Sequence, residues 1–300
     1  MIRWALAGIA LLLVVAGGLT YAFVSPPGLL SLLDRAMGGG WGTERPGTAI
    51  PFGSEGQTLD VWRPAGPVTK RPVVIFWYGG GWVAGTRQAY AFAARAYARN
   101  GFVVVVPDYR KVPQIRFPAM LQDGAQAVKW TRDHIADYGG DPARIGVAGH
   151  SAGAYTVAML TLDPRWLAAE QVDPKIIKAA VGLSGPYDFY PFDKKRSIDA
   201  MQGAKDPLMT QPIHFARGDA APMLLVTSTE DTEVRPRNAI HLTAALKAHG
   251  GAVEFRNYPG ITHENVAMAL SVPFRGKGPV LADSVAFLNA ALGVKATDAR

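Results

Sequence analysis

The chain has 300 residues, and none of them is cysteine. Disulfide bonds, a thiolate nucleophile and cysteine-ligated metal sites are therefore excluded. Two phosphate-binding signatures are also missing: no Lys-Ser or Lys-Thr pair follows the glycine stretch at residues 79–81, and no Gly-x-Gly-x-x-Gly motif opens a helix. The sequence contains no internal repeat and no sign of a second domain. What remains is a chain that is 49% hydrophobic and long enough to bury a large core.

Concentrated positive charge is absent as well, although the chain is basic overall. It carries 31 lysines and arginines against 24 aspartates and glutamates, a formal net charge of +7. The basic residues are scattered, and Lys194-Lys195-Arg196 is the only compact run. Scattered charge is typical of a solvated surface, so we expect no nucleic-acid partner. The sequence carries no signal for an oligomeric state.

Residues 4–24 contain no charged side chain. The run follows Arg3 and ends at a Ser-Pro-Pro sequence, and about 20 apolar residues cross a bilayer as a helix. We predict that residues 1–25 form a transmembrane anchor or uncleaved signal. The rest of the chain would then be extracytoplasmic, and periplasmic in a Gram-negative cell. The alternative is a signal peptide cleaved after residues 20–22, which would give a secreted protein.

A linker is expected at residues 26–54, before a folded domain at residues 55–300. The linker is glycine-rich and includes three consecutive glycines at residues 38–40. Its two leucine pairs, at 29–30 and 32–33, indicate a short amphipathic helix close to the membrane.

Apolar runs of strand length alternate with helical patterns along the folded domain. Strands are predicted at residues 58–62, 72–78, 102–106, 144–148, 177–183, 223–227 and 253–258, and helices at 89–99, 117–138, 152–162, 237–248 and 280–292. This alternation predicts an α/β domain with a mostly parallel central sheet and helices on both faces.

The most informative motif is Gly-His-Ser-Ala-Gly at residues 149–153, between a predicted strand and a predicted helix. A Gly-x-Ser-x-Gly turn in this position lifts the serine hydroxyl clear of the sheet. Gly149 and Gly153 suit the turn because larger residues would crowd it where strand and helix pass closest. Ser151 is therefore the candidate nucleophile.

A serine nucleophile needs a base and an acid that orients the base. His263 follows the last predicted strand, where parallel sheets place their sites, and is the candidate base; an ordinary loop histidine is the alternative. The loop after the strand at 223–227 offers Asp231 as the acid, since aspartate favours turns. Glu230 is the alternative acid.

Main-chain amides are expected to stabilise the negative oxygen that forms during attack. Tyr78-Gly79-Gly80-Gly81-Trp82 directly follows a buried strand, so its glycines can turn N–H groups toward Ser151. We predict an oxyanion hole made by Gly80, Gly81 and Ala152.

Several motifs occur in the same order as in a known fold. They are the Tyr-Gly-Gly-Gly-Trp stretch at 78–82, Asp-Tyr-Arg at 108–110, Gly-Asp-Pro-Ala-Arg-Ile at 140–145 and the serine motif at 149–153. Over roughly residues 55 to 293 the chain resembles esterases and lipases of the α/β-hydrolase fold, especially hormone-sensitive-lipase-like and feruloyl-esterase-like (BD-FAE) carboxylesterases. The resemblance implies hydrolysis of carboxylic esters, or of an arylformamide, through an acyl-enzyme without metal or organic cofactor. A serine peptidase and a catalytically silent binding protein of this fold are the alternatives.

Three aromatic residues are predicted to line the substrate pocket: Tyr78, Trp82 and Tyr187. Tyr78 stands where the resembling families usually have histidine. Tyr187 belongs to the long stretch 184–219, whose aromatics would form a partial lid or simply bury their own segment. Asp108 and Arg110 are interpreted as a loop-locking ion pair, and a functional role near the pocket is the alternative.

Overall fold

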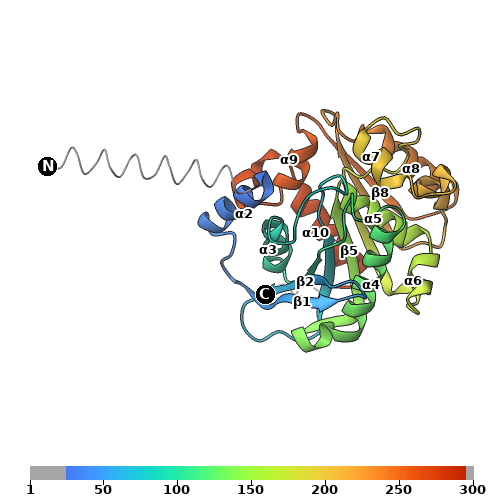
Figure 1. Cartoon of the computed structure of the whole chain (residues 1–300). Helices are drawn as coiled ribbons and strands as arrows, with labels where there is room; N and C mark the ends of the chain where they lie inside the picture. Colours follow the sequence, from blue (N-terminus) through green and yellow to red (C-terminus); the bar gives the residue numbers. More distant parts are fainter. Residues whose placement is uncertain (1–24, 295–300) are drawn as a thin grey trace.

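The computed structural model describes residues 25–294. They form one eight-stranded sheet with helices on both faces (Figure 1). In chain order the strands are β1 (Thr43–Phe52), β2 (Gln57–Pro64), β3 (Arg71–Trp77), β4 (Val103–Pro107), β5 (Gly140–His150), β6 (Ile177–Leu183), β7 (Met223–Ser228) and β8 (Val253–Tyr258).

Six of these strands run parallel. Across the sheet the order is β1-β2-β4-β3-β5-β6-β7-β8. The pairs from β4 through β8 are parallel, while β2 runs antiparallel to both β1 and β4. The predicted α/β class with a mostly parallel sheet is confirmed.

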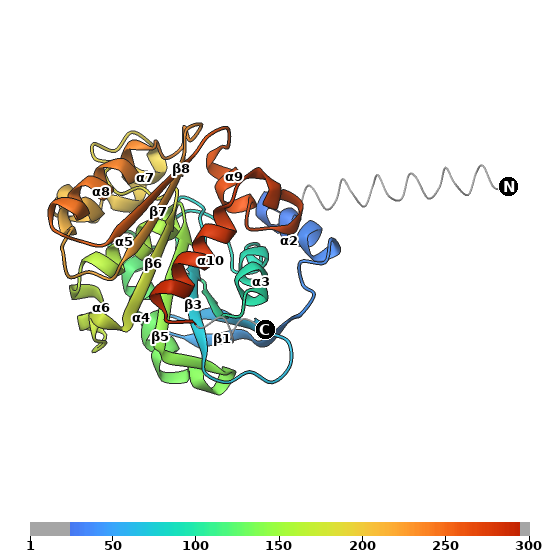
Figure 2. The same ribbon diagram turned by 180° about the vertical axis from the view of Figure 1, so that it is seen from behind.

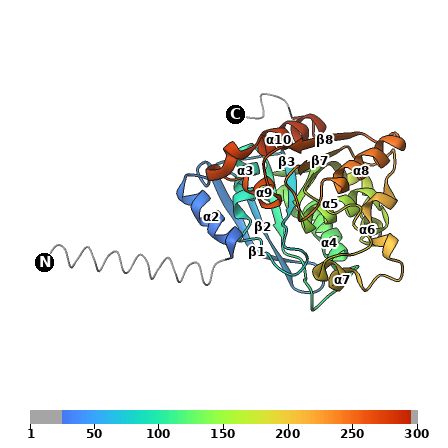
Figure 3. The ribbon, with the colours of Figure 1, turned by 90° about the horizontal axis from the view of Figure 1, so that it is seen from above.

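The helices form two layers. They are α2 (Pro26–Ala36), α3 (Ala91–Arg99), α4 (Ala119–His134), α5 (Ala152–Leu162), α6 (Arg165–Ala169), α7 (Lys195–Met201), α8 (Arg237–Ala248), α9 (His263–Met268) and α10 (Val280–Ala291). Helices α3 and α10 cross one face of the sheet (Figure 2). Seen from above, α4, α5 and α8 cover the other face (Figure 3).

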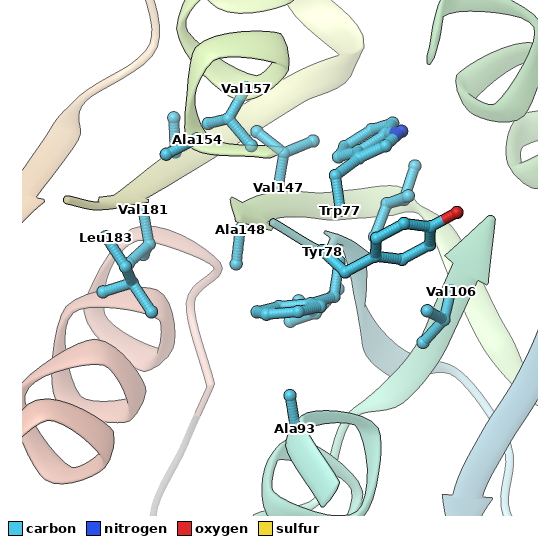
Figure 4. Packing of buried hydrophobic residues seen from close by; sticks show 14 of the residues in the cluster. Trp77, Tyr78, Ala93, Val106, Val147, Ala148, Ala154, Val157, Val181 and Leu183 are labelled. Atoms are coloured by element: carbon cyan, nitrogen blue, oxygen red, sulfur yellow. The ribbon is translucent and has the colours of Figure 1, made fainter. Parts of the chain in front are cut away.

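The core lies between these layers and the sheet. Strand β4 reads Val-Val-Val-Val-Pro and is buried throughout, as expected of a parallel strand covered on both faces. Every residue of α5 is buried too, which fits its uniformly apolar sequence. Ala154 and Val157 of α5 pack on one side of the strands and Ala93 of α3 on the other (Figure 4). This packing fixes the turn between β5 and α5, where Ser151 lies.

Residues 26–52 differ from the predicted linker, because they fold against the domain. Strand β1 adds an edge to the sheet by pairing with β2. Helix α2, which includes the predicted amphipathic helix, is held by a buried ion pair between Asp34 Oδ2 and Arg95 of α3 at 2.8 Å. Asp34 Oδ1 also accepts a hydrogen bond from Val272 N at 2.8 Å. A segment tied by a buried charge pair and a strand ladder is part of the fold.

The predicted membrane anchor lies outside the described residues, apart from Ser25, which caps the first turn of α2. Within residues 25–294, no helix combines the length and apolarity needed to cross a membrane.

Candidate active site

Ser151 occupies a strained turn between β5 and α5. Its backbone angles are φ 54° and ψ −120°, a conformation that L-residues seldom adopt and that costs about 1–3 kcal/mol. Close packing on both sides requires the two motif glycines. A methyl group on Gly149 would lie 2.6 Å from the carbonyl of Gly153, and one on Gly153 would lie 2.1 Å from Trp77 O. The strain and the packing together hold the Ser151 hydroxyl at the end of the sheet.

His263 contacts both of its predicted partners. Its Nε2 lies 2.9 Å from Ser151 Oγ, and its Nδ1 lies 2.8 Å from Asp231 Oδ2. His263 is the first residue of α9, and the Thr262 side chain caps that helix by accepting from Asn265 N. The ring is buried and cannot rotate freely. One ring nitrogen of His263 therefore faces the Asp231 carboxylate and the other faces the Ser151 hydroxyl.

Asp231 is positioned by the loop that follows β7. Its Oδ1 accepts hydrogen bonds from Glu233 N at 3.0 Å and from Val234 N at 2.7 Å, so Oδ2 remains available for His263. The alternative acid, Glu230, is exposed and its side chain contacts Thr229. The structure thus brings Asp231, and not Glu230, to the histidine.

A second imidazole lies beside the first. His150 Nε2 is 3.1 Å from the carbonyl oxygen of His263, and the two ring centroids are 4.8 Å apart. Burial, reinforced by the neighbouring His263, lowers the pKa of His150 to about 3. His150 therefore stays neutral near pH 7 and adds no positive charge next to the imidazole of His263.

Two glycines of the loop after β3 have a positive φ, which few other residues adopt. Gly80 has φ 137° and Gly81 has φ 58°, both in the region that favours glycine. A methyl group on Gly80 would lie 2.2 Å from Ala84 O. Ala152 is the first residue of α5, where N–H groups have no acceptor within the helix. Gly81 and Ala152 border the same cavity as Ser151.

Tyr78 differs from its predicted place in the pocket. It is fully buried beneath the glycine loop, and its hydroxyl donates to Asp108 Oδ1 at 2.7 Å. Asp108 also accepts from Arg87 N at 2.9 Å. Burial is the main cause of the raised pKa of Tyr78, so the phenol remains a donor. The ring of Tyr78 also fills the space beside Gly85, so Tyr78 packs against the segment that follows the glycine stretch.

The predicted ion pair between Asp108 and Arg110 is not formed. Asp108 pairs with Arg87, and Arg110 pairs with Asp123 at 2.7 Å. Arg87 also binds Asp60 at 2.8 Å. Asp108 and Arg110 therefore each hold their loop through an ion pair with a more distant residue. The sequence alone does not identify these partners.

The cavity beside Ser151 has a volume of about 90 Å³. Trp82 lies in its wall as predicted and stacks on Phe189, with ring centroids 6.0 Å apart. Tyr187 does not line this cavity, since it is fully buried with its ring packed over Gly185. Phe189, from the same long stretch, takes the position that Tyr187 was expected to hold.

The remaining wall is charged, which the sequence analysis did not anticipate. Its ionisable residues are Asp193, Lys194, Arg196, Glu233, Arg235 and Arg237. They come from the stretch around α7, from the loop between β7 and α8, and from the first residue of α8. The compact basic run at 194–196 was the sequence signal for part of this wall. Across residues 25–294, no group of three or more histidine and acidic side chains is arranged to hold a metal ion.

Curated proteins similar to this chain are esterases. LipQ of Mycobacterium tuberculosis is 31% identical over 239 residues, which cover 71% of this chain and 56% of LipQ. An isoprenylcysteine alpha-carbonyl methylesterase of Arabidopsis thaliana is 29% identical over 263 residues, 79% of this chain and 60% of that protein. The chain therefore spans little more than half the length of these relatives.

A solved structure with the same fold is the thermostable carboxylesterase EstE1, cloned from a metagenomic library. It superposes with a TM-score of 0.71 at 22% identity, covering 88% of this chain and 95% of that one. The model of the BD-FAE family matches residues 59–246, which include the glycine stretch at 79–81, the serine turn and Asp231. The match extends over more than half of the 300 residues, and the chain belongs to the BD-FAE family.

Proposed function

We propose that this protein is a serine esterase that hydrolyses carboxylic esters through an acyl-enzyme. The observation that carries the proposal is the pair of contacts at His263, 2.9 Å to Ser151 Oγ and 2.8 Å to Asp231 Oδ2. Hydrogen-bonded in this way, the imidazole is in place to take the hydroxyl proton as the oxygen attacks an ester carbonyl.

The reaction proceeds in two halves. Ser151 Oγ bonds to the carbonyl carbon, His263 takes the serine proton, and Asp231 stabilises the imidazolium. The N–H groups of Gly80, Gly81 and Ala152 receive the negative oxygen. The ester C–O bond then breaks, and His263 gives its proton to the departing alcohol. A water molecule that loses a proton to His263 attacks the acyl carbon, the bond to Ser151 Oγ breaks, and that oxygen takes the proton back as the acid leaves.

The cavity beside Ser151 has a volume of about 90 Å³, and we expect it to favour small acyl groups. A panel of 4-nitrophenyl esters from acetate to dodecanoate tests the proposal with the full-length chain. We expect the highest kcat/KM with short acyl groups, and loss of turnover in Ser151→Ala and His263→Ala.

The same panel separates the alternatives. Turnover of aminoacyl anilides in place of esters would identify a peptidase, and preferential turnover of N-formyl anilines an arylformamidase. No turnover of any acyl compound would favour a silent binding protein. Wild-type rates in the folded His263→Ala protein would overturn the assignment of the base.

We also propose that the N-terminal segment anchors the protein to a membrane, with the esterase domain extracytoplasmic. The uncharged run at residues 4–24 supports this. So does the apolar exposed face of α2, where Leu29, Leu32 and Leu33 are 40%, 52% and 44% exposed. Alkaline extraction of membranes should leave the full chain in the pellet. A soluble protein that begins at Phe23 would instead indicate a cleaved signal.

A further inference from the structure

The mouth of the catalytic cavity carries an excess of positive charge. Four of its six ionisable side chains are basic and two are acidic. A cavity that serves only neutral esters has no need of this excess, because charge at a mouth attracts ligands of the opposite sign.

Two of the four basic side chains, Lys194 and Arg196, are partly neutralised by Glu233. Lys194 Nζ lies 3.0 Å from Glu233 Oε2, and Arg196 contacts the same oxygen. The hydrogen bond from Lys194, followed by the effect of Arg196, lowers the pKa of Glu233. Two cations thus share one ionised carboxylate, and this cluster alone retains one positive charge.

The cluster reaches the oxyanion loop. A methyl group placed on Gly81 would lie 2.6 Å from Arg196 Cδ. The stem of Arg196 therefore lies directly on the loop predicted to receive the carbonyl oxygen, and its guanidinium group extends to Glu233 on the loop that also holds Asp231. The salt bridges join the 184–219 stretch to the acid loop across the cavity entrance.

Two further cations are available to a ligand. Arg235 and Arg237 line the cavity and are exposed. Among residues 25–294, no acidic side chain forms an ion pair with either of them. Arginine side chains without a protein partner at the entrance to a cavity can offer their forked N–H groups to a carboxylate or phosphate.

The apolar part of the cavity complements this arrangement. Trp82 and Phe189 stack on one another in its wall. A ligand whose reacting ester lies beside Ser151, with a neutral body against these rings, would place a terminal acid group among the arginines.

We propose that the preferred substrates are esters that carry a negatively charged acid group, bound at the cavity mouth by Arg235 and Arg237 with Arg196 beside them. This inference rests on the proposed esterase function and specifies its substrate class. The bound group is remote from the scissile bond. Its recognition therefore lowers KM and leaves kcat little changed.

Two matched pairs of esters test the charge and its position. On the alcohol side, 4-acetoxybenzoate is compared with the neutral 4-acetoxybenzamide. On the acyl side, the methyl monoester of glutaric acid is compared with methyl pentanoate. With the full-length wild type we expect kcat/KM to be about 10-fold higher for the charged member of at least one pair, the scale of one charge-assisted contact. The preference should shrink as sodium chloride is raised.

A double variant tests the two arginines. In Arg235→Gln/Arg237→Gln the preference should disappear, because KM should rise more for the charged ester than for the neutral one. The matched control is Lys195→Gln/Lys247→Gln, which removes the same net charge from exposed lysines outside the cavity wall. The control should keep the preference.

Each outcome is decisive. Equal kcat/KM for charged and neutral members of both pairs in the wild type would overturn this inference and leave the esterase function standing. A preference that survives in the double arginine variant, or that falls equally in the lysine control, would overturn the role of the two arginines. Failure to hydrolyse any ester would remove both the inference and the function on which it rests. Preference for the charged ester, lost only in the arginine variant, is the result we expect.

Discussion

Two hollows border the adjacent residues His150 and Ser151, and their walls are opposite in chemistry. The hollow at Ser151 measures about 90 Å³, and six ionisable side chains lie in its wall. The hollow at His150 measures about 240 Å³ and is almost wholly apolar. It lies between α2 and α9, with Leu30, Phe92 and Met268 in its wall. The candidate nucleophile borders the charged hollow and not the apolar one.

The difference arises at the turn itself. Neighbouring side chains on the tight elbow point in different directions, so that Ser151 meets the imidazole of His263 while His150 meets its backbone carbonyl. One histidine is poised for proton transfer. The other is held neutral by burial, with its pKa lowered to about 3. Two histidines that lie side by side thus differ because only His263 contacts the Ser151 hydroxyl and the Asp231 carboxylate.

The largest effect is expected from replacing Asp231, the candidate acid beside the charged hollow. Asp231→Asn should lower kcat by about 10⁴-fold, because the amide favours the wrong tautomer of His263. Glu230→Gln, one residue away and exposed, is the matched control and should retain wild-type rates. Steady-state kinetics with 4-nitrophenyl acetate measures both. Equal losses in the two variants would contradict the assignment of Asp231.

A smaller effect is expected beneath the oxyanion loop. Tyr78→Phe removes the hydrogen bond to Asp108 and should cost about 1–2 kcal/mol of unfolding free energy. The loosened loop should lower kcat by roughly 10-fold, the scale of one positioned contact, with KM for acetate esters nearly unchanged. Tyr190→Phe, an exposed tyrosine, is the control. Unchanged kcat in Tyr78→Phe would show that the phenol does not position the loop.

The smallest effect on activity is expected from replacing His150, which borders the apolar hollow. His150 has an ordinary pKa near 6.5 and a folded pKa of about 3, so between these values the unfolded chain binds a proton that the folded chain does not. The unfolding free energy should therefore decrease as pH falls through this window, by up to about 1.4 kcal/mol per pH unit.

Replacing that histidine should flatten the slope. His150→Gln is expected to lose part of the decrease between pH 6.5 and 4, while its kcat near neutral pH changes only a few-fold. Urea unfolding at stepped pH measures the slope, and His249→Gln, an exposed histidine, is the control. Identical slopes in the wild type and His150→Gln would mean that the buried imidazole does not contribute to acid sensitivity.

The chemistry of the site was largely predictable because it rests on short-range signals. Ser151 lies between two motif glycines, and the turn is packed too closely at both positions for a larger residue. The predicted acid and base each follow a buried strand, and parallel strands end at one edge of a sheet. The contacts of His263 with Ser151 and Asp231 follow from this geometry.

What the sequence did not predict depends on distant partners. The predicted linker folds because Asp34 meets Arg95, 61 residues further along the chain. Its glycines and prolines resembled a flexible segment, yet Gly39 is required by the close approach of Asp34. Tyr187 is fully buried and Phe189 lines the cavity. The sequence around these two aromatic residues does not show which of them faces the cavity. Contacts between residues so far apart in the sequence cannot be predicted from local sequence patterns.

The most direct measurement is covalent labelling of the full-length chain with a fluorophosphonate, followed by intact-mass analysis and peptide mapping. We expect one adduct per chain, on Ser151, absent in Ser151→Ala and formed much more slowly in His263→Ala. A folded wild-type protein that takes up no label, or that carries it on a different serine, would contradict the assignment of Ser151, His263 and Asp231 as one catalytic unit.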